Sequence, residues 1–268
     1  MSNGNWWNEI EREIGARRSL VVATVVRDWG SVPRRTGAKM LILADGTTRG
    51  TVGGGAFEAT VLRDAQAALT AQRSVTHTYN FQPQQSTSNP NARTFGAVCG
   101  GRVEVFLEVM MPRERLLIVG GGHCGRALAQ AALLLDWEIV LCDDREEWTQ
   151  TDDLPPTIEV LRIAPDAHDL PAVDESTFVV LVGKGFPIDE AALRRVLSAP
   201  LPYLGMIGSQ RKKQTVFDNL RRDGFSEELL ARVHAPIGLE IGAETPAEIA
   251  VSILAEIIQV RAQRHESS

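Results

Sequence analysis

Three glycines near the middle of the chain have the spacing of a dinucleotide-binding turn. Gly120, Gly122 and Gly125 form the pattern G-x-G-x-x-G directly after the apolar run Leu116–Val119. In such a turn the first glycine permits a tight bend, the second lets the backbone approach a pyrophosphate, and the third lets the next helix lie close to the strand. The free N–H groups of that helix would face a phosphate. The pattern therefore predicts a nucleotide-type phosphate site.

Three side chains near this turn could contact the same ligand. Asp143 lies 23 positions beyond Gly120, close to where an acid that hydrogen-bonds a ribose belongs, and Arg145 beside it could instead accommodate a ribose phosphate. His123, at the predicted helix start, could contact a phosphate or a substrate. The plainer alternatives stay open, with Asp143 as a turn residue and His123 as a polar residue at a helix end.

A second glycine run lies in the N-terminal half. Gly53, Gly54 and Gly55 precede a predicted helix that begins at Phe57 and carries Glu58 in its first turn. Bare backbone donors at such a corner could bind an anion, and three consecutive glycines cost more chain entropy than a simple corner requires. The alternative is a tight strand-to-helix corner.

Basic residues at two further places could hold phosphate. Arg34 and Arg35 lie in the polar loop 30–37 and could grip a phosphate in a bidentate manner, or form an exposed basic turn. Ser209 is a natural N-cap, and Arg211 follows it in the first turn of a predicted helix, where positive charge opposes the helix dipole. An anionic ligand would remove this conflict. A solvated basic helix face is the alternative.

Of the three cysteines, Cys99 is the candidate for chemistry. It precedes Gly100 and a predicted strand, and its thiolate could ligate a soft metal or carry sulfur. Alternatively it is a small residue at a strand entry. Cys142 lies in an apolar run and Cys124 inside the glycine fingerprint, so both are predicted to pack rather than to react.

Composition and missing motifs narrow the function. The 28 Lys+Arg against 34 Asp+Glu give a net charge of −6, which argues against a general nucleic-acid binder. No apolar stretch reaches the roughly 18 residues of a membrane span, and residues 1–8 lack the features of a secretory signal. An odd number of cysteines without a C-x-x-C pair indicates reduced thiols and a cytoplasmic location. The G-x-S-x-G, H-E-x-x-H and Walker motifs are absent, so no catalytic residue is predicted.

The elements that must position these residues fall into two groups. We expect an α/β protein with an N-terminal mixed α+β domain over residues 1–111, followed by a Rossmann-like, doubly wound parallel-sheet domain with a terminal helix over 112–268. The N-terminal expectation is a helix over 1–18, strands at 19–27, 38–43 and 48–52, a helix from Phe57, a strand at 77–81, a long polar loop at 82–97 and a strand at 103–109. The C-terminal expectation is strands at 115–119, 138–142, 159–163, 177–183 and 203–207, and helices at 123–135, 189–197, 211–223 and from Thr245 to about Val260.

Several ordered motifs resemble the xanthine dehydrogenase accessory (XdhC/CoxI) family. The N-terminal motifs are Gly30-Ser31-x-Pro33-Arg34-x-x-Gly37, Gly50-Thr51-x-Gly53-Gly54-Gly55-x-x-Glu58 and Cys99-Gly100-Gly101-x-Val103. The C-terminal motifs are Val119-Gly120-Gly121-Gly122-His123, Cys142-Asp143-Asp144-Arg145, Gly205-Met206-Ile207-Gly208-Ser209 and Pro236-Ile237-Gly238-Leu239. Together they span nearly the whole chain. One departure is Ala56, where some relatives carry a cysteine after the triple glycine, so Cys99 would act alone.

The resemblance implies a molybdenum cofactor chaperone rather than an enzyme. Such proteins bind molybdopterin, in some cases in a nucleotide form, and protect it from oxidation. They support its sulfuration by a cysteine desulfurase and insert it into an apo molybdenum hydroxylase of the xanthine dehydrogenase class. The family is cytoplasmic and commonly dimeric. The alternatives are an NAD(P)-dependent oxidoreductase that uses the fingerprint, and a Rossmann domain that senses a nucleotide.

Overall fold

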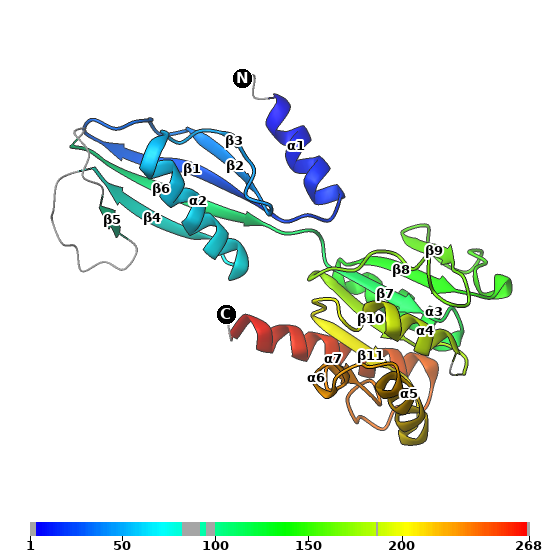
Figure 1. Cartoon of the computed structure of the whole chain (residues 1–268). Coiled ribbons are helices and arrows are strands. Elements are labelled where there is room, and N and C mark those ends of the chain that lie inside the picture. Colours follow the sequence, from blue (N-terminus) through cyan, green and yellow to red (C-terminus); the bar gives the residue numbers. More distant parts are fainter. Residues whose placement is uncertain (1–3, 82–91, 95–99, 186, 267–268) are drawn as a thin grey trace. The chain divides into compact units, whose positions relative to one another are not determined.

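The chain forms two compact units, Met1–Pro112 and Arg113–Ser267. A computed structural model describes residues 4–81, 92–94, 100–185 and 187–266. Figure 1 shows one sheet in each unit.

The N-terminal unit is built on a sheet of six strands. Their order across the sheet is β3-β2-β1-β6-β4-β5, antiparallel except where β5 runs parallel to β4. The strands are β1 (Leu20–Trp29), β2 (Lys39–Leu43), β3 (Thr48–Gly50), β4 (Val75–Asn80), β5 (Ala92–Thr94) and β6 (Arg102–Met110).

One helix covers each face of this sheet. In β1, Val21, Ala23 and Val25 pack toward α2 (Gly55–Thr70), whereas Leu20 and Val22 pack toward α1 (Gly4–Gly15). This alternation is the period of two expected for a strand buried on both faces. Each helix contributes an apolar face to these cores: Trp6, Ile10 and Ile14 from α1, and Phe57, Val61, Ala65 and Leu69 from α2.

The C-terminal unit is a parallel sheet in the order β9-β8-β7-β10-β11-β12. This is the 3-2-1-4-5-6 order of a Rossmann fold, in which the direction of winding reverses between β7 and β10. The strands are β7 (Arg115–Val119), β8 (Glu138–Asp143), β9 (Ile158–Arg162), β10 (Thr177–Leu181), β11 (Tyr203–Met206) and β12 (Val233–His234).

Helices cover both faces of this sheet, so the predicted doubly wound fold is confirmed. One apolar core joins α3 (His123–Ala132) and α7 (Pro246–Glu266) to Leu116 and Ile118 of β7. The other core joins α4 (Pro187–Val196) and α5 (Gln210–Arg222) to Leu117 and Val119. A short helix, α6 (Glu227–Leu230), follows α5.

The differences from the sequence prediction are local. The predicted helix over 123–135 ends in the 3-10 turn Leu133–Leu135. The loop predicted at 82–97 contains β5, and its other residues lie outside the described ones. The pattern does not predict β12 or α6, which are too short to show periodicity. The predicted helix from Thr245 begins with a capping box, in which Thr245 N donates to Glu248 Oε2 at 2.9 Å and Glu248 N donates to Thr245 Oγ1 at 3.3 Å.

Gly125 should be essential to the C-terminal fold. A Cβ at this position would overlap the Gly120 carbonyl oxygen, whereas one at Gly122 would meet nothing within 4 Å. We expect Gly125→Ala to lower the free energy of unfolding by about 2 kcal/mol through overpacking. Gly122→Ser should change it by less than about 0.5 kcal/mol, since serine is favoured at an N-cap. Urea titration followed by circular dichroism checks both, and equal effects would contradict the packing argument.

Candidate functional site

The triple-glycine turn of the N-terminal unit is filled by a carboxylate from its own helix. Glu58 Oε2 accepts hydrogen bonds from the Thr51 hydroxyl at 2.5 Å and from the Gly54 N–H at 3.0 Å. The Gly53 N–H donates to Thr51 Oγ1 at 3.1 Å. The expectation of bare donors is therefore wrong for Gly53 and Gly54. The tight-corner alternative describes them, because Gly53, Gly54 and Gly55 have φ angles of +148°, +77° and +63°, which favour glycine.

The hydrogen bonds at this turn keep Glu58 ionised. Burial by itself raises the pKa of Glu58, but the bonds from Thr51 and from the N–H groups of the turn outweigh burial, so the pKa lies below its ordinary value. The dipole of α2 also favours a negative charge at this end of the helix. A ligand phosphate would repel Glu58, so it must bind beside the turn rather than in it.

The basic loop 30–37 lies against the turn. A Cβ on Gly53 would come within 2.6 Å of Pro33 Cβ, which places the residue before Arg34 in direct contact with the turn. Arg35 is engaged, because its Nη1 donates to Asp28 Oδ2 at 2.8 Å. Arg34 is exposed and has no ion-pair partner among the described residues. Arg34 is thus the guanidinium available to an anion.

The start of β6 completes the same corner. Gly100 forms a β-bridge with Ser31, and a Cβ on Gly101 would come within 2.6 Å of the Trp29 carbonyl oxygen. We define the glycine corner as Pro33, Arg34, Gly53–Gly55, Glu58 and Gly100–Gly101. The structure therefore brings together the predicted N-terminal site residues that it describes. Cys99 lies outside the described residues, so its role as a metal ligand stays a prediction.

In the C-terminal unit the fingerprint glycines have the geometry of their predicted places. Gly120 has a φ of +120°, and a Cβ there would come within 2.5 Å of the Val182 backbone, so only glycine permits the bend from β7 past the end of β10. Gly122 is the N-cap of α3 and faces open space. Gly125 lets α3 pack against the turn. The turn thus lies at the carboxyl end of the sheet, where strand order reverses and Rossmann folds bind ligands.

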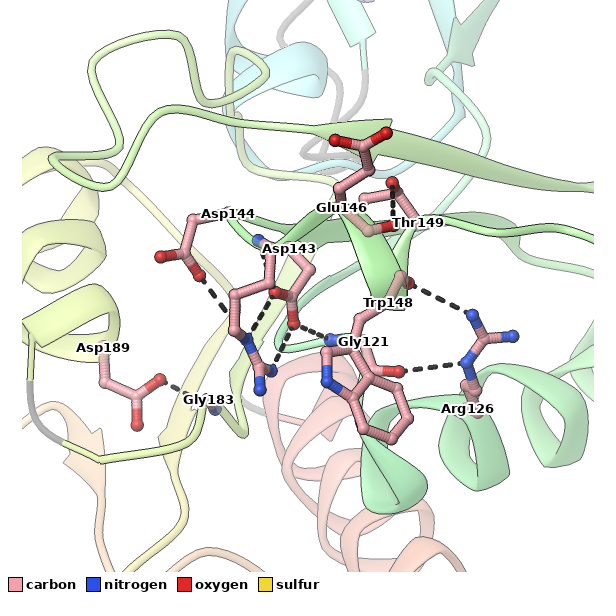
Figure 2. Close-up of polar contacts among 10 residues, drawn as sticks. Gly121, Arg126, Asp143, Asp144, Glu146, Trp148, Thr149, Gly183 and Asp189 are labelled. Atoms are coloured by element: carbon pink, nitrogen blue, oxygen red, sulfur yellow. Dashed lines mark hydrogen bonds and ion pairs between the residues drawn. The ribbon is translucent and has the colours of Figure 1, made fainter.

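Asp143 binds the protein itself rather than standing free for a ribose. Its carboxylate is 2% exposed and accepts the Gly121 N–H at 2.6 Å. It also accepts Arg145 N at 2.9 Å, Arg145 Nε at 3.0 Å and Arg145 Nη2 at 2.9 Å. Figure 2 shows Asp143 directed at Gly121. Burial alone raises the pKa of Asp143, but these bonds outweigh it and the pKa lies below its ordinary value. The turn-residue alternative fits this geometry, because both carboxylate oxygens are already engaged.

A second buried carboxylate lies at the end of β10. Asp189, in the first turn of α4, is fully buried, accepts the Gly183 N–H at 2.9 Å and pairs with Lys212 Nζ at 2.5 Å. Burial raises the pKa of Asp189, and Lys212 opposes this rise. Lys212 is therefore neutralised within the unit and is not available to an anion.

The start of α5 includes a cation that is available to an anion. Ser209 is confirmed as the N-cap, because its hydroxyl accepts the Lys212 N–H at 3.3 Å. Arg211 is exposed and has no ion-pair partner in the described part of the chain. Contact of Ser209 or Arg211 with a phosphate stays a prediction.

The two cysteines that the structure describes are buried or half-buried, and His123 makes a ring contact. Cys142 is fully buried, and burial raises the pKa of its thiol to about 12; burial also raises the pKa of the Cys124 thiol. His123 is exposed and packs edge-on against Trp148, with ring centroids 5.3 Å apart. Within the described ranges, no three His, Cys, Asp or Glu residues gather as a metal site, and no helix is both long and apolar enough to cross a membrane.

Four site residues are not identified by the sequence patterns. The sequence gives only a weak indication of Thr51 and Asp189. Thr51 precedes the glycine run, and Asp189 lies in the first turn of α4. Lys212 is recognisable only as part of a basic helix start. Arg126 binds the Gly121 carbonyl oxygen through Nε at 3.1 Å, and no sequence pattern indicates that contact.

Comparison with known proteins agrees with this architecture. Residues 116–257 match the XdhC Rossmann domain, and residues 14–80 match the XdhC and CoxI family. A solved structure described as a xanthine dehydrogenase from Bacillus halodurans shares the fold, with a TM-score of 0.52, 22% identity and 97% of each chain covered. The fold is thus that of a two-unit protein with a Rossmann half. The chain belongs to the XdhC and CoxI family.

Three curated relatives are longer than this chain. YqeB of Escherichia coli, described as uncharacterized, is 37% identical over 90% of this chain and 43% of its own length. A probable subunit of xanthine dehydrogenase from Bacillus subtilis is 26% identical over 59% of this chain and 46% of its own. The molybdenum cofactor insertion chaperone PaoD of Escherichia coli is 30% identical over 36% of this chain and 30% of its own. The chain therefore spans less than half the length of the curated relatives it matches.

The ionised state of Glu58 should make stability depend on pH. Because the folded-state pKa is lowered, the stabilisation is present above the ordinary glutamate pKa and is lost as pH falls through the folded-state value. We expect Glu58→Gln to cost about 1 kcal/mol at pH 7, with the difference from wild type vanishing in acid. Exposed Glu11 supplies the control Glu11→Gln. Urea titrations across pH measure both, and a pH-independent difference would refute the charge assignment.

Proposed function

We propose that the chain is a chaperone that binds the molybdenum cofactor and inserts it into a molybdenum hydroxylase of the xanthine dehydrogenase class. Family membership supports this role, as do the names of the relatives from Bacillus subtilis and of PaoD. The observation that carries the proposal is the guanidinium of Arg34 in the glycine corner, which has no ion-pair partner among the described residues and lies in the half that matches the XdhC and CoxI family.

The residues of the corner suit the phosphate end of such a cargo. Arg34 offers a planar pair of donors that matches a phosphate, and Gly54 and Gly55 leave open space where their side chains would stand. Glu58 holds a fixed negative charge on one side of the turn and so directs an anion toward Arg34. The corner acts by binding and orienting; its described residues include no nucleophile.

The finer steps of the role belong to the same proposal. While the cofactor is bound, the chain protects it from oxidation and presents it to a cysteine desulfurase that exchanges an oxo for a sulfido ligand. Cys99, next to Gly100 in sequence, is the side chain we assign to the molybdenum end. The chain acts as a homodimer in the cytoplasm and returns to its free state after insertion, without turnover of its own.

An NAD(P)-dependent oxidoreductase is the second candidate. The Rossmann strand order and the fingerprint at Gly120 favour it. The engagement of Asp143 with Gly121 and Arg145 weighs against it, because the acid that would hold a ribose is already bonded. Hydride transfer between a nicotinamide and a small substrate would favour this candidate over the chaperone.

Removal of Arg34 should weaken cofactor retention. We expect Arg34→Ala, purified anaerobically from cells with an active molybdenum pathway, to carry at least about tenfold less pterin, because a charge-assisted hydrogen bond contributes about 1.5 kcal/mol or more. Exposed Arg73 in the same unit supplies the control Arg73→Ala. Mass spectrometry of the bound pterin is the measurement. Equal retention by the two variants would remove Arg34 from the site.

Cys99 should affect the metal rather than the pterin. If its thiolate contacts the molybdenum centre, Cys99→Ala should lower the molybdenum-to-pterin ratio and leave the pterin content near that of wild type. Metal analysis of the same anaerobic preparations measures the ratio. An unchanged ratio would exclude Cys99 as a ligand.

A further inference from the structure

The segment after β8 folds back over the glycine fingerprint. We call residues 146–153 the latch. Arg126 of α3 holds it, since Nη2 donates to the carbonyl oxygens of Trp148 at 3.1 Å and Gln150 at 2.8 Å. Nη1 pairs with the Asp153 carboxylate, and Nε binds the Gly121 carbonyl oxygen at 3.1 Å. One guanidinium therefore joins the latch to the turn (Figure 2).

The latch also touches the turn directly. A Cβ on Gly121 would come within 2.6 Å of the Trp148 carbonyl oxygen, so the backbones meet with no room for a side chain. The Trp148 ring packs against His123 at 5.3 Å between centroids, and the Arg145 guanidinium lies 5.5 Å from that ring. The Gly121 N–H donates its hydrogen bond to the Asp143 carboxylate. The β8 side of the turn is thus closed by the chain itself.

This closed side is where one half of a dinucleotide belongs. In the 3-2-1-4-5-6 sheet a dinucleotide lies across the carboxyl ends of the strands, with one ribose held by the acid that ends the second strand. Here that strand is β8 and that acid is Asp143. The latch and the Asp143–Arg145 pair therefore stand where the ribose and its base would lie. A Cβ on Gly122 would meet nothing within 4 Å, so the turn is open at this residue.

We propose that the latch is an autoinhibitory contact that closes the Rossmann unit to adenine dinucleotides, with Arg126 as the residue that holds it shut. A nucleotide can bind only to the fraction of molecules in which the latch is open. Its apparent Kd is therefore the Kd of the open form divided by that fraction. Arg126 is 12% exposed and bonds four partners at once, which makes the closed form dominant. The inference concerns the C-terminal unit and does not depend on the proposed chaperone function.

Two variants open the latch by different routes. Arg126→Met removes all four bonds while it keeps an apolar stem of similar length. Gly121→Ala retains Arg126 but adds a methyl group against the Trp148 carbonyl oxygen, and the general fingerprint allows a side chain at this position. Arg195→Met is the matched control, because exposed Arg195 on α4 lies outside the latch. Asp153→Asn, at a 63% exposed side chain, is a milder variant should either of the first two fail to fold.

The test is calorimetric titration of the full chain with NAD⁺. We expect at least about tenfold tighter binding by Arg126→Met and Gly121→Ala than by wild type or Arg195→Met, together with faster amide exchange in residues 148–153. Adding Gly122→Val to Gly121→Ala should abolish the gain, because the added side chain fills the space beside the turn.

Three results would overturn the proposal. Wild type could bind NAD⁺ as tightly as the opened variants, which would show that the latch does not obstruct nucleotide binding. The opened variants could gain amide exchange without gaining affinity, which would show that the latch does not limit binding. The gain could survive Gly122→Val, which would place the bound nucleotide elsewhere.

Discussion

In three turns of this chain an internal carboxylate accepts the N–H group of a glycine. Glu58 binds Gly54, Asp143 binds Gly121 and Asp189 binds Gly183. Each bond satisfies a backbone donor that a strand-to-helix turn leaves without a partner, and each carboxylate is charged or paired at the point where an anionic ligand would approach. At each of these turns the glycine N–H nearest to an incoming anion is therefore already hydrogen-bonded within the protein. A phosphate must reach cations beside them, of which Arg34 and Arg211 have no ion-pair partner among the described residues.

The sequence predicts the scaffold of these sites better than their chemistry. The apolar runs of β7 and β8 and the glycine spacing are enough to predict a Rossmann half, because a parallel strand buried on both faces has few other arrangements. The capping box at Thr245 and the N-cap at Ser209 can equally be predicted from the sequence, since each depends on residues three positions apart. β12 is not predictable, because two residues give no period and β11 supplies its hydrogen bonds.

The roles of the polar side chains are harder to predict, because they depend on partners distant in sequence. Asp143 occupies the position of a ribose-binding acid, yet the neighbouring Arg145 and the Gly121 N–H consume its oxygens. Glu58 lies at the helix start where it is expected, but its contact with Gly54 turns an anion-binding corner into one that repels anions at its centre. Arg34 and Arg35 look alike in sequence, and only the position of Asp28 shows which one is engaged.

The close contact of Gly121 with Trp148 has an evolutionary consequence. In the general fingerprint, the position between the first two glycines varies freely, because no ligand contact restricts its side chain. Here the neighbouring carbonyl oxygen leaves no volume for one, so the middle glycine of the three is required by the protein's own chain rather than by a cofactor. Position 121 should therefore covary with position 126, because Arg126 binds the Trp148 carbonyl oxygen: lineages that lose the arginine are released to accept larger residues at 121, and lineages that keep it are held to glycine.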